Sequence, residues 1–283
     1  ITTKENRSKG MGIVGAAFGL GFILGPALGG IFSQFNLLEH NPELARFGIN
    51  PFSVVAFAAS ILAFLNFLWV QARFSESSPK ENRGKGESRN PISRLSEKFS
   101  PEIAKTNLTY FVFMFAFAGM EFTLTFLGAD RFGFTPQQNA WMMVFVGFIL
   151  ALVQGGLVRR LAPKFGEKPV AMSGLSFVSV GLVVLGLAKS VIGLYSGLAL
   201  LAVGVGLCSP TLSSMVSLFA HESRQGSVLG TFRAIGSLAR AVGPLLASFI
   251  FWWFGSLQLY LFGAAITAFS LWLCSRVPAP TKN

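Results

Sequence analysis

Three charged side chains lie inside long apolar stretches of this sequence: Glu121, Arg233 and Arg240. Insertion scales put one such residue at the centre of a bilayer at roughly 2.5–3.5 kcal/mol, so each should face protein or a water-filled cavity, with a partner. Arg233 and Arg240 are seven residues apart and therefore share one face of a helix. A carboxylate and a guanidinium in this setting can form a buried ion pair or take part in proton transfer.

The predicted depths of Glu121 and Arg240 allow them to meet. Glu121 lies about four residues, and Arg240 about one, past the middle of its apolar stretch, so their heights differ by ~4.5 Å. Burial favours the protonated acid, whereas a neighbouring guanidinium favours the carboxylate. Glu121 is therefore either a proton-coupling carboxylate, released from Arg240 in one conformation, or half of a structural buried ion pair. Arg233, nearer the cytoplasm, is expected to help lock the inward end.

The stretches that carry these charges belong to a polytopic membrane protein. Of 283 residues, 52% are hydrophobic and 12% charged, and the mean hydropathy is +0.58, a balance outside that of soluble domains. Apolar runs long enough to cross about 30 Å of hydrocarbon predict helical spans. These spans lie near residues 10–34, 52–72, 106–128, 140–158, 169–188, 193–218, 227–251 and 257–275. The fold class is an all-α helical bundle in the membrane.

The net charge of +11 follows from topology. The loops on one side of the predicted spans hold 18 Lys and Arg residues, and those on the other side hold three. By the positive-inside rule both ends of the chain and the long loop are cytoplasmic, which places the protein in a plasma or bacterial inner membrane. Nucleic acid is an unnecessary partner, and attraction to anionic lipid is a secondary use of the basic loops.

The loop over residues 73–105 divides the chain into an N-terminal part, 1–72, and a six-span part, 106–283. Residues 75–89 mix Ser, Glu, Lys, Gly and Asn, a composition typical of a flexible linker. Residues 92–99 have apolar side chains at helical spacing, which predicts either an amphipathic helix on the inner membrane surface or a merely helical linker.

The next helix has a clear start signal. Ser100 followed by Pro101 has the pattern of an N-cap and a first helical residue. The third span is therefore expected to begin in the cytoplasm, before its apolar run.

A pattern of small residues occurs twice. Ala17, Gly21, Gly25 and Gly29 are four apart, an arrangement that lets a second helix approach closely in lipid. The full pattern of the first copy is Gly12, Gly21, Gly25, Pro26, Gly29 and Gly30. The second copy, at an offset of 218 residues, is Gly230, Ala239, Gly243, Pro244, Ala247 and Ser248. This offset predicts a repeat of six helices, and hence a twelve-helix protein of which the chain forms the last eight.

The first copy matches, position by position, the antiporter signature in the fifth helix of drug:proton exporters, so the chain resembles the major facilitator superfamily. It looks closest to the tetracycline-transporter-like branch. The resemblance implies helices five to twelve of a twelve-helix fold, in which the seventh and eleventh helices pack together and the seventh and tenth line a central cavity. A degenerate form of a second family motif is present at residues 156–160, without its acidic residue.

Few polar side chains are available to line such a cavity. The candidates are Thr123, Thr125, Ser209 and Pro210, with Asn107 and Gln154 as further polar groups. Each could equally be a helix contact. No metal-ligand cluster, phosphate loop or nucleophile arrangement is present in the sequence.

These features predict a secondary transporter, not an enzyme. The expected activity is proton-coupled efflux of amphipathic small molecules or drugs by alternating access, performed by a monomer without a cofactor and driven by a proton gradient. One alternative is a scaffold or receptor that keeps the fold without transporting. A membrane-embedded enzyme is a weaker alternative, because it would need His, Asp or Cys side chains clustered at one depth.

Overall fold

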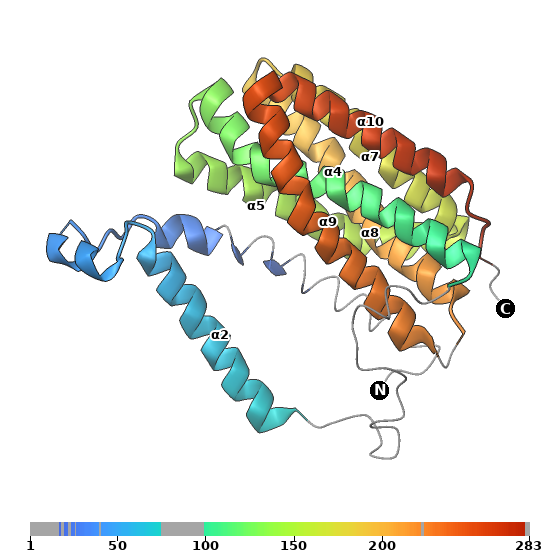
Figure 1. Cartoon of the computed structure of the whole chain (residues 1–283), viewed down its shortest axis with the longest axis horizontal. Coiled ribbons are helices and arrows are strands. Elements are labelled where there is room, and N and C mark those ends of the chain that lie inside the picture. Colours follow the sequence, from blue (N-terminus) through green and yellow to red (C-terminus); the bar gives the residue numbers. More distant parts are fainter. Residues whose placement is uncertain are drawn as a thin grey trace.

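The computed structural model describes residues 17, 20–21, 24–25, 27–39, 41–74, 99–221 and 224–280, and its regular elements are helical (Figure 1). Seven of the described helices are long and apolar enough to cross a membrane. The remaining predicted span, near 10–34, lies partly outside the described residues, and residues 27–32 of it are helical.

The membrane-length helices match the predicted spans and extend beyond several of them. A short 3-10 helix, η1 (Pro42–Phe47), precedes them, and one long helix is divided by the π-helical turn η3. The bounds are α2 (Ser53–Arg73), α4 (Pro101–Phe132), α5 (Pro136–Leu152), η3 (Val153–Leu157), α6 (Val158–Phe165), α7 (Glu167–Leu187), α8 (Val191–Phe219), α9 (Gln225–Phe254) and α10 (Ser256–Ser275).

The start of α4 confirms the predicted cap. The Ser100 side chain accepts a hydrogen bond from the backbone N–H of Ile103 at 3.5 Å, and Pro101 occupies the first turn. Residues 101–105, which lie in the segment predicted as the cytoplasmic linker, form the first turns of this helix, as its start signal predicts. The predicted flexible segment and amphipathic helix, residues 75–98, fall outside the described residues.

The segment 159–168, predicted as a basic loop, is mostly helical. The helix that begins as α5 runs through η3 into α6 and ends at Phe165, with Pro163 in its last turn. Gly166 then turns the chain with φ +87. The prediction was wrong because apolar length marks the membrane-embedded part of a helix and misses charged turns that continue it into water.

A close crossing of α7 and α8, built on glycine, helps to hold together the six-helix bundle formed by α4 to α10. Between α7 and α8, a Cβ at Gly174 would lie 2.7 Å from the carbonyl oxygen of Gly204, and one at Gly181 would lie 2.8 Å from the backbone nitrogen of Leu201. Figure 1 shows these helices side by side. Small residues allow such contact in lipid, where van der Waals packing replaces the hydrophobic drive between helices.

Arg131 binds three helices together near one end of the bundle. Its Nη1 donates to the carbonyl oxygens of Gly186 at 2.8 Å and Ala188 at 2.9 Å, and more weakly to that of Leu185 at 3.3 Å. Its Nη2 donates to Ser256 Oγ at 2.6 Å. The end of α4 is thereby bonded to the last carbonyls of α7, which have no partner inside that helix, and to the start of α10.

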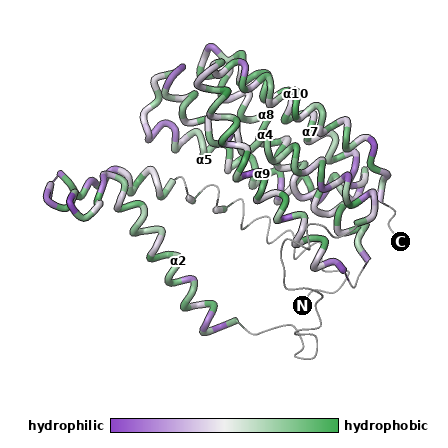
Figure 2. Tube along the Cα trace, viewed as in Figure 1, coloured by the Kyte–Doolittle hydropathy of each residue, from purple (hydrophilic) through white to green (hydrophobic). Residues whose placement is uncertain are grey.

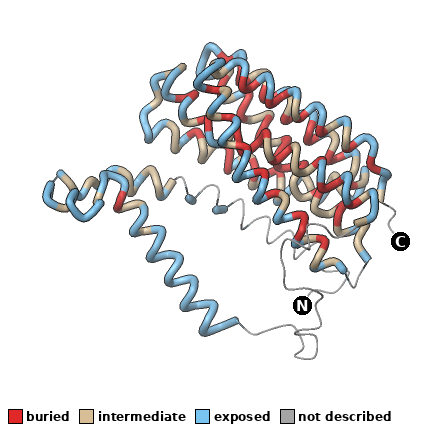
Figure 3. The backbone as a smooth tube through the Cα atoms, in the orientation of Figure 1, coloured by how far each residue is buried: buried red, intermediate tan, exposed pale blue. Residues whose placement is uncertain are grey.

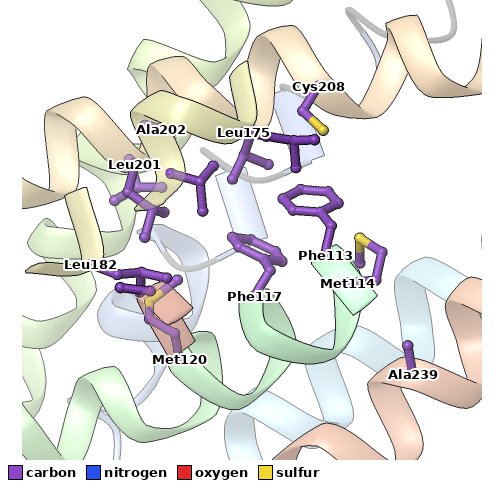
Figure 4. Close-up of a cluster of buried hydrophobic side chains, with 14 of the residues drawn as sticks. Phe113, Met114, Phe117, Met120, Leu175, Leu182, Leu201, Ala202, Cys208 and Ala239 are labelled. Atoms are coloured by element: carbon purple, nitrogen blue, oxygen red, sulfur yellow. The ribbon is translucent and has the colours of Figure 1, made fainter. Parts of the chain in front are cut away.

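The core of the bundle is formed by buried side chains of α4, α5, α7, α8, α9 and α10. Figure 4 shows Phe113 and Phe117 of α4 pointing toward Leu175 and the α8 side chains Leu201 and Cys208, all of them buried. The rings of Phe113 and Phe117 lie 6.2 Å apart. The helices of the bundle are mainly hydrophobic along their length (Figure 2). Many of their large apolar side chains, such as Leu245 and Trp252, are exposed, as expected of a protein that meets lipid.

Helix α2 stands apart from this bundle (Figure 1). Ser53 is its one buried residue, and it is exposed along its length (Figure 3). Its side chains are apolar on every side, with Phe64 60% and Trp69 69% exposed. A helix that is apolar all round belongs in a membrane or in a protein interior.

Candidate functional site

The predicted charged residues lie on α4 and α9, which cross at a glycine contact. A Cβ at Gly243 of α9 would lie 2.6 Å from the carbonyl oxygen of Phe115, and one at Gly119 of α4 would lie 2.8 Å from the Cβ of Ala247. The two helices pack against each other along much of their length. This confirms the predicted packing of these two helices and brings Glu121 into the neighbourhood of α9.

Glu121 is half-buried and is near Arg240 without being paired to it. The charge of Arg240 acts on the Glu121 carboxyl, yet no ion pair or hydrogen bond joins these groups within the described part of the chain. Both Arg233 and Arg240 are exposed on α9. The closed pair proposed from their depths is therefore absent from this conformation, because equal height does not fix which way two side chains point around their helices.

Tyr110 is a site residue that the sequence analysis missed. Its ring stacks on Phe232 of α9, with centroids 3.9 Å apart and an interplanar angle of 17°. A Cβ at Gly236 would lie 2.7 Å from Tyr110 Cε1, so this glycine makes room for the ring. The charges of Arg240 and Arg233 both act on Tyr110. The available signal was its position about three helical turns before Glu121, which places both residues on one face of α4.

The predicted cavity residues divide into two groups. Thr125, Ser209 and Pro210 are half-buried, and they stay candidates for a substrate surface. Thr123 is 1% exposed, and its hydroxyl donates to the carbonyl oxygen of Gly119 at 2.9 Å. In this conformation the helices packed on this side of α4 cover Thr123, and its place in a cavity stays a prediction.

Two further polar side chains named from the sequence are now placed. Asn107 is buried, and its Oδ1 has no hydrogen-bond partner among the described residues. Gln154 is half-buried in the π-helical turn η3. Neither contacts Glu121 in any interaction that the structure records, so they lie outside the group formed by Glu121, Tyr110 and the arginines.

Among the described residues of the first copy of the glycine pattern, Gly30 packs against another helix. Gly12 and Pro26 lie outside the described residues. No described atom comes within 4 Å of a Cβ built at Gly21, Gly25 or Gly29, whereas a Cβ at Gly30 would lie 2.9 Å from the Cβ of Ala140 on α5. The contact recorded among the described residues is at Gly30, which faces a different side of the helix. The predicted close approach along the row Gly21, Gly25 and Gly29 stays a prediction.

In the second copy, Gly230 is open and Gly243 is tightly packed. Pro244 lies inside α9, where its carbonyl accepts a hydrogen bond from Ser248 Oγ at 2.7 Å. In the described part of the chain, no group of three or more His, Cys, Asp or Glu side chains is arranged to hold a metal ion.

Comparison with known proteins agrees with this architecture. The profile described as Major Facilitator Superfamily matches the chain in two overlapping segments, residues 1–244 and 157–283. The major facilitator superfamily domain-containing protein 10 of Homo sapiens is 30% identical over 293 residues, which cover 98% of this chain and 61% of that protein. The tetracycline resistance protein, class C, of Escherichia coli is 28% identical over 253 residues, which cover 89% of this chain and 60% of that protein.

A solved structure is similar over the same extent. The crystal structure of the human organic anion transporter MFSD10 (TETRAN) superposes with a TM-score of 0.75 at 28% identity and covers 97% of this chain and 65% of that protein. The chain therefore spans about three fifths of the length of the curated relatives that it matches.

Proposed function

Because the chain belongs to the Major Facilitator Superfamily, we propose that it works as part of a secondary active transporter that moves small amphipathic molecules by alternating access. The activity belongs to the whole protein, of which the chain would supply the C-terminal six-helix bundle and the helices that precede it. The plasma or bacterial inner membrane is the proposed location, with both ends of the chain in the cytoplasm, as the distribution of Lys and Arg indicates.

Proton coupling is proposed for Glu121. This proposal rests on the carboxyl of Glu121, which is half-buried in an apolar span. The carboxyl lies near Arg240 but forms no ion pair with it within the described part of the chain. Such a carboxyl can be protonated when the guanidinium is distant and ionised when it is close. A conformational change that alters the distance between α4 and the Arg240 side chain would then bind a proton in one state and release it in the other.

Export against an inward flow of protons is the proposed direction. It is supported by the glycine signature of the first copy and by the similarity to a tetracycline resistance protein. Organic anions are proposed among the substrates, because a similar solved structure is that of an organic anion transporter.

The test uses the full natural protein in vesicles, with tetracycline as the probe and an imposed proton gradient. Glu121→Gln keeps the size of the side chain and removes its charge, so gradient-driven accumulation should fall to the level seen without a gradient, while exchange of tetracycline down its own gradient persists. Glu102→Gln, in the first turn of the same helix, is the matched control and should leave accumulation unchanged.

The outcomes separate the parts of the proposal. Full gradient-driven accumulation by a correctly folded Glu121→Gln protein would contradict the role of Glu121. If protons move in the same direction as the substrate, the proposal of antiport would be contradicted, but the proposals of transport and of proton coupling by Glu121 would not. If neither tetracycline nor any organic anion among a panel of probes moves protons in wild-type vesicles, the chain belongs to a scaffold or receptor that keeps the fold.

A further inference from the structure

The end of α10 meets the first turn of α7 in a corner that carries two positive charges. Lys168 of α7 donates from its Nζ to the carbonyl oxygen of Ser275 at 2.9 Å, and Arg276 follows Ser275 directly. Two segments more than a hundred residues apart in the sequence thus bring a lysine ammonium next to the backbone of an arginine. We call Lys168, Arg276 and Trp272 the α7–α10 corner.

The α7–α10 corner is held in place by contacts inside the bundle. Val277, the residue after Arg276, is 1% exposed and belongs to the core. The backbone N–H groups of Arg276 and Val277 donate to the carbonyl oxygens of Leu273 at 3.0 Å and Cys274 at 3.1 Å. The Arg276 guanidinium lies over the Trp272 ring, 5.4 Å from its centroid. A site whose groups are fixed in advance loses less entropy when it binds a ligand.

Both cations of the corner have neutral partners. Lys168 bonds to a carbonyl oxygen and Arg276 lies over an aromatic ring, and among the residues that the structure describes no carboxylate forms an ion pair with either of them. An ammonium has three N–H donors, of which Ser275 takes one, and a guanidinium has five. The corner therefore has both the charge and the donors to bind an anionic oxygen group.

The depth of the corner matches that of lipid headgroups. Helix α10 has 20 residues and is about 30 Å long, the thickness of the hydrocarbon layer, so Arg276 at its end falls at the membrane–water interface. Beside it, the rings of Phe269 and Trp272 are stacked 5.6 Å apart and are 49% and 51% exposed. Tryptophan at the end of a span is typical of this interface.

The corner lies away from the part of the chain that precedes the bundle. Helices α7 and α10 are on the side of the bundle opposite α2 (Figure 1). The contact at Gly30 brings the first part of the chain to Ala140 of α5, a helix that packs mainly against α8, whereas α10 packs against α7, α4 and α9. This arrangement favours lipid over a protein segment at the corner.

A phosphodiester is the anion that best fits this position. Arginine binds phosphate oxygens in a bidentate manner, and basic residues at the cytoplasmic surface are attracted to anionic lipid. A lipid also brings acyl chains, which the exposed rings of Phe269 and Trp272 can contact, whereas a free phosphate ion gains nothing from them.

We propose that the α7–α10 corner is a binding site for the headgroup of an anionic phospholipid. The lipid phosphate is bound by Lys168 and Arg276, and the upper part of an acyl chain runs along Trp272 and Phe269. The leaflet follows from the proposed orientation, which puts this end of α10 in the cytoplasm. The binding itself needs no substrate, gradient or proton.

The test measures equilibrium binding of fluorescent phosphatidylglycerol to the full natural protein in detergent, with phosphatidylcholine of the same chains and label as the zwitterionic comparison. Wild-type protein should bind phosphatidylglycerol at least about 5-fold more tightly. A large excess of inorganic phosphate should not displace it. Equal affinity for the two lipids would overturn the proposal without any variant, and displacement by phosphate would show a site for free anions instead.

Variants then test the two cations. Arg276→Gln and Lys168→Gln should each weaken phosphatidylglycerol binding about 5-fold. Unchanged phosphatidylcholine binding by the same proteins shows that they are folded. Lys168→Arg keeps the charge and should retain most of the affinity. Arg159→Gln, which removes an exposed cation of α6, is the matched control, and a loss equal to that of Arg276→Gln would mean that net charge, not the corner, selects the lipid.

The ring is tested by Trp272→Leu. Without the ring under its guanidinium, Arg276 loses a support worth roughly 2- to 5-fold in affinity at an exposed site, so phosphatidylglycerol binding should weaken by that factor. Unchanged binding would remove Trp272 from the site. Because none of these measurements involves transport, their failure would leave the proposed function standing, and a protein that fails to couple protons could still bind the lipid.

Discussion

The two copies of the glycine pattern use the same spacing for different contacts. In the first copy, Gly30 faces a side chain, the methyl group of Ala140. In the second, Gly243 faces a backbone atom, the carbonyl oxygen of Phe115. A methyl group can be removed or shifted, whereas a helix backbone cannot retreat without moving the whole helix. Repeated sequence spacing therefore predicts that a glycine is used for packing, but the neighbouring helix decides how strictly it is required.

The two copies also differ in charge. At the positions of Arg233 and Arg240 in the second copy, the first copy has Gly15 and Phe22. The copy with the stricter glycine contact is thus the one that carries the arginines. The close contact keeps the backbone of α9, which carries Arg233 and Arg240, next to the backbone of α4, which carries Tyr110 and Glu121.

Gly243→Ala should have the largest effect of the glycine substitutions. The added Cβ would meet the Phe115 carbonyl at 2.6 Å, and overpacking of this kind costs about 1–3 kcal/mol. The measurement is the thermal unfolding midpoint of the full natural protein in detergent, which should fall. An unchanged midpoint would contradict the backbone contact between α4 and α9.

Gly30→Ala should have a smaller effect that can be reversed. Its Cβ would meet the Ala140 Cβ at 2.9 Å, so the expected loss of stability is about 1 kcal/mol or less. Adding Ala140→Gly removes the opposing methyl group and should restore most of that loss. If the double variant is no more stable than Gly30→Ala alone, the two residues are not in contact in the natural protein.

Gly230→Ala should have the smallest effect, and of opposite sign. No described atom lies within 4 Å of its Cβ position, and alanine is favoured over glycine inside a helix by about 0.8–1.0 kcal/mol. Unfolding by heat should therefore occur at an equal or slightly higher temperature. A clear loss of stability would mean that a segment outside the described residues packs against Gly230 as tightly as Phe115 packs against Gly243.

Much of the fold of this integral multi-pass membrane protein could be predicted, because each span must be apolar over a length that the bilayer sets. The cap at Ser100 was also predictable, since it depends on two neighbouring residues. The extension of α4 to Phe132 and the helical residues of α6 were not, because charged turns in water follow no hydropathy rule.

The candidate site was predicted less completely. Glu121, Arg233 and Arg240 could be named because a charge in an apolar span is costly wherever it points. The burial of Thr123 was not foreseen and Tyr110 was missed for one common reason: the sequence gives the face of a helix on which a residue lies, but not which neighbour covers that face. For Tyr110, the covering element is α9, more than a hundred residues later in the chain.

Arg131 has a mechanical consequence for any transport cycle. A guanidinium that holds the end of α7 and the start of α10 to the end of α4 turns that corner of the bundle into a fixed joint. If the bundle rocks, these three helices would then move as one rigid body, without bending relative to one another. The flexing would fall to the helix that runs through η3, where Gly155 and Gly156 have open space around them and the wider π-helical turn already departs from regular geometry.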